Sequence, residues 1–450
     1  MGKMRVPEDA YYGAQTARAI ENFPISGWRF PRSFIRVLGL IKKHAAAVNG
    51  DLGLLPRTMA ETIMAAAQEV TDGKWDEQFI VDIFQTGSGT STNMNANEVI
   101  AHRAEELLGG KTRVHPNDHV NRGQSSNDVI PTALHMAAFA TMRQTLVPAL
   151  SLLESDLHKK AEEWREIIKI GRTHLQDATP LRLGQEFGGF SSQVSHGLER
   201  LVSMERHLAE LALGGTAVGT GINTHAEFAR RTIAAIAQET GLPFREAENH
   251  FEAQSGRDAA VELSGALKTI AVSLIKIAND IRLLGSGPRL GLGELKLPAT
   301  QPGSSIMPGK VNPVMCEMLV QVCCQVIGND TAITFAGASG HLQLNAMIPV
   351  IAHNLLQSLE LLARATEVFA QRCVRGLQPN VAKLDQNVEQ SLALATALVP
   401  KIGYDAATAI AKEAERTSRS VRAVAKELSG LDEKTLDQLL DPEHQVAPTP

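Results

Sequence analysis

Seven large aliphatic residues recur along residues 258–284 at alternating steps of four and three. They are Leu263, Leu267, Ile270, Leu274, Ile277, Ile281 and Leu284. This spacing lays one apolar stripe along a helix, as in helices that pack against others over their whole length. The breaker run "GSGPRLGLG" ends the stripe, so we predict one rod of more than twenty residues. A stripe of about three heptads also favours packing against a second chain.

Similar patterns predict further rods, over roughly residues 131–164, 181–213 and 348–362. Several long rods with short polar connections are typical of an elongated helical bundle. A chain with 44% hydrophobic but only 4% aromatic residues suits packed helices. We therefore expect an all-α, mainly helical fold in three domains. These are an N-terminal helical domain at 1–122, a central helical-bundle domain at 123–383 and a small C-terminal helical domain at 384–450.

The charge and the apolar runs exclude some classes of partner. The net charge is −5 and no basic run has interleaved aromatic residues, so we expect no nucleic-acid partner. The start "MGKMRVPEDAYYG" has no apolar signal region, and no stretch of about 18 apolar residues offers a membrane span. We expect a soluble, cytoplasmic protein without membrane contact, or a mitochondrial matrix protein in a eukaryote.

The four cysteines lack the CxxC spacing and the nearby histidine pair of a zinc site. They are Cys316, Cys323, Cys324 and Cys373. We predict neither a metal site nor a disulfide, and we expect reduced thiols in the core. Reduced thiols indicate a reducing compartment.

Four polar segments combine small hydroxyls, amides and histidines with glycine or proline. They are Thr86–Asn95, His115–Asp128, Gly171–Pro180 and Gly303–Pro313. One such segment is ordinary turn and capping chemistry, because Ser, Thr and Asn bond their own backbone in turns. Four of them at the ends of rods favour a shared polar cleft, within one chain or between chains.

The glycine-rich stretches do not have the spacing of phosphate-binding loops. "GSSIMPGKV" has five residues between its glycines and valine after its lysine, so it departs from the P-loop pattern. "GTAVGTGINT" and "GSGTST" lack the GxGxxG spacing and the preceding strand of a dinucleotide fold. We predict no nucleotide cofactor.

The segment "GSSIMPGKVNP" indicates a site for a small anion. Asn312 before Pro313 reads as a cap at a helix start, whose amides face the loop beside the cation of Lys310. That combination suits a carboxylate. Ser304 and Ser305 lie where backbone amides could stabilise a serine oxyanion, which would make the serine a base. No GxSxG surrounds them, so acyl-enzyme hydrolysis is not indicated.

Two further residues are candidates for proton transfer. His174 stands in a polar loop, and Glu317 falls on the first turns of the helix expected at Pro313, where its carboxylate could orient an imidazole. Taken singly, each of these residues, like Lys310, is better explained as an ordinary solvated side chain.

"GSSIMPGKVNP" matches at every fixed position the GSSxMPxKxNP signature loop of the fumarase/aspartase superfamily, which the chain resembles from "VPEDAYYGAQTARAIENFPISG" to its C-terminal helices. "TGSGTSTNMN", "SSND", "MPGK" and the Cys316–Glu317 pair make it most similar to class II fumarases. Aspartases tend to show AGTS, STND, PAK and PE there. The resemblance implies reversible hydration of fumarate to L-malate, a tricarboxylic acid cycle reaction, without metal or organic cofactor.

The resemblance also implies roles for single residues. Ser304 would remove the Cβ proton of malate, and His174, oriented by Glu317, would act on the water side through an ordered water. Side chains on four segments would bind the carboxylates of the substrate. They are Ser88, Thr90, Ser125, Ser126, Asn127, Thr173, Ser305, Lys310 and Asn312. The implied assembly is a homotetramer with a helical superbundle, in which three subunits share each active site.

The family's second, peripheral dicarboxylate site would correspond to His115, Asn117 and Asp118. The residue three before this histidine, an arginine in some fumarases, is Thr112 here. Two alternatives to a hydratase remain at this point. One is an ammonia lyase acting on aspartate, and the other is a silent member of the fold kept as a structural protein.

Overall fold

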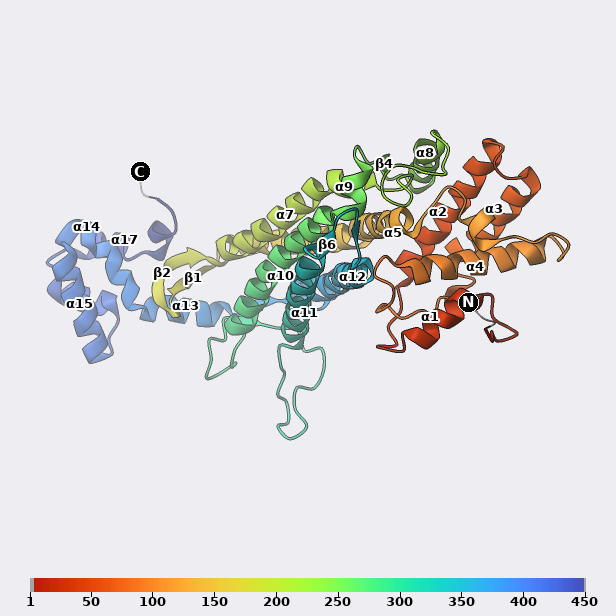
Figure 1. The fold of residues 1–450 in the computed structure, drawn as a ribbon. Helices are drawn as coiled ribbons and strands as arrows, with labels where there is room; N and C mark the ends of the chain where they lie inside the picture. Colours follow the sequence, from red (N-terminus) through yellow and green to blue (C-terminus); the bar gives the residue numbers. More distant parts are fainter. Residues whose placement is uncertain (1–3, 449–450) are drawn as a thin grey trace. The chain divides into compact units, whose positions relative to one another are not determined.

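The computed structural model describes residues 4–448, and these are mainly helical (Figure 1). The chain forms two compact units, each built from three segments. The first comprises Met1–Pro148, Gly197–Ala271 and Val322–Arg364, and the second comprises Ala149–His196, Val272–Gln321 and Ala365–Pro450. The three-domain division drawn from the sequence remains a prediction.

The first unit begins with short helices and continues into long ones. Its elements up to residue 148 are α1 (Ala14–Asn22), α2 (Arg32–Asp51), α3 (Arg57–Thr71), α4 (Thr90–Leu107), α5 (Ser126–Thr141) and the start of α6 (Val147–Glu163). Later segments add α8 (Phe228–Thr240), α9 (His250–Ser255) and the strand pairs β3 (Glu210–Leu211) with β4 (Arg245–Glu246) and β6 (Gly340–His341) with β7 (Leu344–Asn345). Its core is aliphatic, as the composition predicts.

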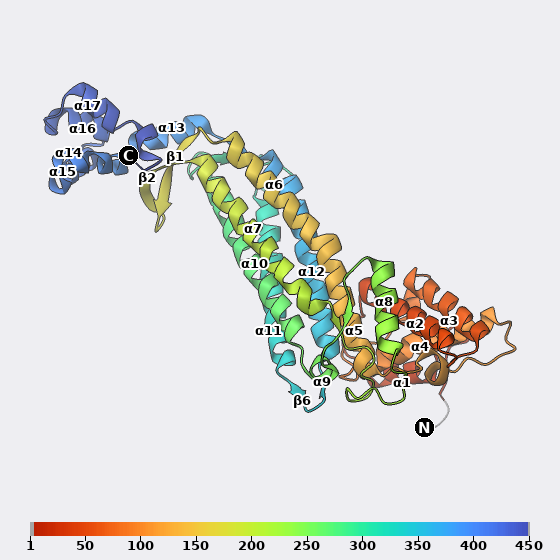
Figure 2. The same cartoon turned by 90° about the horizontal axis from the view of Figure 1, so that it is seen from above.

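Long helices α7 (Leu183–Leu208), α10 (Asp258–Leu284), α11 (Val314–Gly337) and α12 (Ile348–Arg372) contribute residues to both units. The second unit adds the hairpin β1 (Ile168–Thr173) and β2 (Gln176–Arg182), the strand pair β5 (Leu295–Lys296) with β8 (Gln378–Pro379), and a C-terminal group of helices (Figure 2). That group is α13 (Val381–Gln390), α14 (Val399–Ile402), α15 (Tyr404–Thr417), α16 (Val421–Leu428) and α17 (Glu433–Leu439).

The rods predicted from apolar spacing are present. The seven stripe residues of α10 are all at most 5% exposed, and the helix ends at Leu284, directly before the glycine run. The rod expected over residues 131–164 is α5 and α6, joined by one π-helical turn at Met142–Leu146. Apolar periodicity found these helices because each buries a continuous face.

Two expectations differ from the structure. Gly171–Pro180, expected as a loop, lies within the β1–β2 hairpin. The strand that contains Ile168 and Ile170 is too short to show a clear alternating pattern in the sequence. All four cysteines are free, but Cys324 is exposed rather than in the core, because it follows buried Cys323 and so points to another face of α11. No helix among residues 4–448 combines the length and apolarity that crossing a bilayer requires.

Candidate active site

The segment Gly303–Asn312 forms a closed loop directly before α11. Gly303 N donates to Lys310 O at 2.8 Å, and Asn312 Nδ2 donates to Gly303 O at 2.7 Å. A Cβ on Gly303 would lie 2.4 Å from Lys310 O, so only glycine allows the two ends of the loop to approach this closely. Between the two ends, Ser305 to Lys310 are exposed. The result is a solvent-facing loop on a fixed base.

Ser304 Oγ accepts two backbone hydrogen bonds inside this loop. Ile306 N lies 3.2 Å and Met307 N 3.0 Å from the oxygen. Two donors aimed at one oxygen favour its negatively charged form, which is the arrangement expected of a serine that must give up its proton. The neighbouring Ser305 has no side-chain hydrogen bond within residues 4–448.

Lys310 and Asn312 are brought together, although not as a helix cap. Lys310 Nζ donates to Asn312 Oδ1 at 2.7 Å, and the helix begins at Val314, one residue later than expected. The expectation that Asn312 caps the helix is therefore wrong, because its side chain is used to close the loop. The exposed cation beside the start of α11 still forms a site that suits a carboxylate.

His174 occupies the tip of the β1–β2 hairpin. Thr173 pairs with Gln176, which leaves His174 and Leu175 as the two-residue turn, with φ of 57° and 61°. Turns with positive φ at both positions normally carry Asn or Gly, so a histidine and a leucine here store backbone strain. Such strain at an exposed tip is typical of functional positions.

His174 and Glu317 do not meet within the chain. Neither side chain makes a hydrogen bond or ion pair to any residue among 4–448. The orientation of His174 by Glu317, as the resemblance implies, is absent from the single chain.

In the first unit, the N-terminal ends of α4 and α5 carry the other predicted hydroxyls. Ser88 Oγ and Thr90 Oγ1 lie 2.8 Å apart at the start of α4. Ser125 caps α5, and Asn93 Nδ2 on α4 donates to Ser126 Oγ at 3.2 Å, which joins the two ends. Two helix N-termini that meet make a favourable site for an anion.

Asn127 contributes to this region through its backbone and side chain. Its N–H donates to Ser125 Oγ at 3.2 Å, and its Nδ2 donates to Ala217 O at 2.8 Å. The side-chain amide therefore ties the start of α5 to the segment that follows β3.

Two buried charges that sequence reasoning missed support these helix ends. Lys42 Nζ donates to Asn121 and Gln124 side chains at 2.9 Å, and burial lowers its pKa to about 7. Asp128 Oδ1 accepts from Ser125 N at 2.9 Å, and burial raises the pKa of Asp128 to about 6. The one sequence signal for these buried charges was Lys42, which stands among the apolar residues of α2.

The three residues of the expected second dicarboxylate site lie on or beside a π-helical turn at Pro116–Val120. His115 Nδ1 accepts from Asp118 N at 3.1 Å and lies 3.2 Å from its carboxylate. Asn117 and Asp118 are exposed. A second carboxylate at His115 would compete with Asp118.

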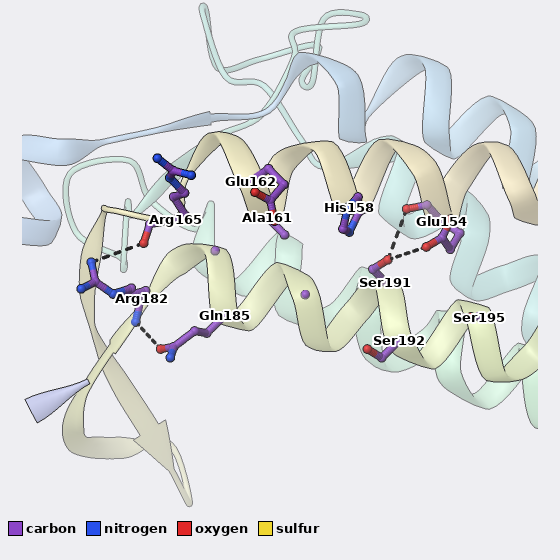
Figure 3. Close-up of a pocket in the computed structure, with 12 residues that line it drawn as sticks. Glu154, His158, Ala161, Glu162, Arg165, Arg182, Gln185, Ser191, Ser192 and Ser195 are labelled. Atoms are coloured by element: carbon purple, nitrogen blue, oxygen red, sulfur yellow. Dashed lines mark hydrogen bonds between the residues drawn. The ribbon is translucent and has the colours of Figure 1, made fainter. Parts of the chain in front are cut away.

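A cavity of about 520 Å³ lies between α6 and α7 (Figure 3). Its polar groups bond one another: Ser191 Oγ donates to Glu154 Oε1 at 3.0 Å, and Arg182 N donates to Gln185 Oε1 at 2.9 Å. None of the predicted site residues lines it. Among residues 4–448, no group of three His, Cys, Asp or Glu side chains is placed to hold a metal ion.

Comparisons with known proteins cover the whole chain. The family model described as Lyase matches residues 2–328, and the one described as Fumarase C C-terminus matches residues 394–445. "Fumarate hydratase class II" of Neisseria meningitidis is 53% identical, covering 100% of this chain and 98% of that protein. The protein of the same name from Halobacterium salinarum is 56% identical, covering 98% and 95%.

Solved structures agree with these relatives. A class II fumarase from Schistosoma mansoni superposes with a TM-score of 0.97 at 42% identity, covering 100% of this chain and 98% of that one. A fumarate lyase:delta crystallin from Brucella melitensis, bound to cobalt, gives 0.94 at 48% identity, covering 98% and 97%.

Proposed function

This chain belongs to the class II fumarase family of lyases, and we propose that it catalyses the reversible hydration of fumarate to L-malate as a hydro-lyase. The observation that carries the assignment to this site is the loop Gly303–Asn312. It holds a serine oxygen with two amide donors and a cation for a carboxylate within one closed turn of chain.

The difficult step is removal of the Cβ proton of malate, which is a very weak acid. The carbanion becomes accessible when the adjacent carboxylate takes up the charge as an aci-carboxylate, so donors must be strongest in that state. Lys310 would supply the positive charge beside this carboxylate. Asn312, Thr173 and Ser305 would also bind it. The N-terminal ends of α4 and α5, through Ser88, Thr90, Ser125, Ser126 and Asn127, would hold the other carboxylate.

Ser304 is proposed as the base for this proton. Ser304 must release its own proton to solvent before it takes the proton of malate, and the amides of Ile306 and Met307 lower the cost of that negatively charged oxygen. On the opposite face, His174 with Glu317 would transfer a proton to the leaving hydroxyl through a water. General acid and base assistance of this kind contributes about 10² to 10⁴ in rate.

The site is proposed to be shared between chains of a homotetramer. Within residues 4–448, the side chains of His174 and Glu317 have no hydrogen-bond or ion-pair partner, and Leu175 beside His174 and Ile306 in the Ser304 loop are 75% and 84% exposed. Exposed apolar residues next to unpaired polar ones indicate a surface that a second chain covers. The apolar stripe of α10 does not supply this surface, because its seven residues are already buried within the chain.

Two finer proposals go with this assignment. His115, Asn117 and Asp118 would form a weaker second dicarboxylate site. The reaction would run in the cytoplasm, or in the mitochondrial matrix if the source is a eukaryote.

The test is turnover of malate by the purified protein and by Ser304→Ala. Formation of fumarate by the wild type, lost in the variant, supports the assignment. A fully active Ser304→Ala protein would show that another group is the base.

A further inference from the structure

A buried cluster of charges in the second unit includes Arg172, two residues before His174, but none of the predicted site residues. It consists of Lys169 and Arg172 on β1, Glu186 on α7 and Glu294 directly before β5. The side chains of Lys169 and Glu294 are 2% and 1% exposed. Buried charges are retained only where they are paired, so this cluster has a definite geometry.

Glu294 is the centre of the cluster. Its Oε1 accepts from Arg172 Nη2 at 2.8 Å and from Asn387 Nδ2 at 3.0 Å, and its Oε2 lies 3.4 Å from Lys169 Nζ. Glu186 also pairs with Lys169, at 3.1 Å. Within residues 4–448, no hydrogen bond or ion pair joins Glu186 to Arg172. Glu294 therefore holds both cations of β1, and Glu186 holds one.

Arg172, the residue that pairs with Glu294, lies two residues before His174. Between them, Thr173 closes the strained two-residue turn at the hairpin tip. A turn with two positive φ values persists only when the surrounding structure holds it. The Arg172–Glu294 pair ties this hairpin to a buried carboxylate outside it, whereas Asp177, the other partner of Arg172 at 3.6 Å, lies on β2 within the hairpin.

The backbone of Glu294 is fixed as well as its side chain. Its N–H donates to Leu284 O at 2.9 Å, its C=O accepts from Asn380 N at 2.8 Å, and β5 follows at once. Glu294 is therefore a rigid point to which Arg172 ties the hairpin of His174.

We propose that Glu294 is a positioning residue for catalysis, which through Arg172 fixes the hairpin that carries His174. This inference rests on the proposed hydratase function. A positioning residue of this kind contributes to the transition state more than to substrate binding, because misplacement of about 1 Å costs up to about 10² in rate.

The test compares Glu294→Gln with the matched control Glu186→Gln, which removes a charge from the same cluster without touching Arg172. Glu294→Gln should lower kcat by about tenfold or more with KM changed less than about twofold. Glu186→Gln should leave both values within about twofold of wild type. Arg172→Lys, which keeps the charge but shortens the reach, should behave like Glu294→Gln and serves if that variant does not assemble.

Two outcomes contradict separate claims. Wild-type protein without hydratase activity overturns the proposed function. An active wild type in which Glu294→Gln and Arg172→Lys keep their kcat, or lose it no more than Glu186→Gln at equal thermal stability, overturns the positioning role alone.

Discussion

Ser304, the proposed base, obtains its hydrogen-bond donors from the backbone of its own loop. The two amides that face its Oγ come from residues two and three positions later, so the loop geometry itself prepares the oxygen. Sequence reasoning predicted this from glycine, serine and lysine in one short segment. It could not predict that Asn312 would close the loop, because the partner Gly303 is nine residues away in sequence.

We predict that Ser304→Ala lowers kcat for malate dehydration by about 10² to 10⁴, since the base is removed and its general-base contribution is of that size. Steady-state kinetics in both directions measures this. The control is Ser305→Ala, because this neighbouring serine has an exposed hydroxyl. We expect a smaller effect there, mainly on KM, and equal losses in the two variants would argue against a specific base.

Lys42 gives a prediction about stability and pH. Burial lowers its pKa to about 7 from the usual 10.5, so between these values the unfolded chain binds more protons than the folded one. The free energy of unfolding should therefore rise with pH above about 7, by at most about 1.4 kcal/mol per pH unit. Asp128, whose pKa is raised to about 6, acts oppositely at lower pH.

The measurement is denaturant unfolding from pH 7 to 9 for wild type, Lys42→Met and Lys43→Met. The rise of the unfolding free energy with pH should disappear in Lys42→Met. It should persist in Lys43→Met, because Lys43 in the wild type pairs with Glu239 near the surface. An identical pH slope in all three proteins would mean that Lys42 stays charged in the folded state.

At the scale of elements, the β1–β2 hairpin is the part that apolar periodicity could not reveal. A strand pair of this length carries no long pattern, and its tip has His174 and Leu175 where a turn of this kind favours Asn and Gly. The long helices, by contrast, follow directly from spacing, because each buries a continuous face in its own chain.

The strain at Leu175 can be measured. With φ at 61°, Leu175→Gly should be more stable than Leu175→Ala by about 1 kcal/mol, because glycine adopts this conformation without Cβ clashes. Both variants lose the exposed leucine side chain, so the comparison isolates the backbone. Thermal unfolding decides, and an alanine variant as stable as the glycine variant would show that the turn is unstrained.

At the scale of the whole molecule, the predicted site residues are divided between the two units, and the acidic and basic partners do not meet in one chain. Sequence patterns singled out the segments because these are chemically unusual, and the site residues within them stay a prediction. The patterns could not predict which segments meet, since contacts between residues distant in sequence leave no periodic signal. The resemblance to a family, rather than any pattern, suggested the shared site.

Sharing between subunits predicts complementation. Ser304→Ala and His174→Asn homotetramers should each be inactive, whereas subunits mixed and reassembled in equal amounts should regain activity in about a quarter of the sites, by random pairing of intact segments. Native mass spectrometry confirms the mixing. Mixed tetramers without activity would show that both residues act from the same chain.

Hydration of fumarate by this chain can be followed by the ultraviolet absorbance of the fumarate double bond. Purified protein in chelator-treated buffer is mixed with L-malate and, in parallel, with L-aspartate. We predict fumarate from malate alone. Fumarate from aspartate alone would show an ammonia lyase, and no change with either substrate would contradict catalysis of both kinds and favour a structural role.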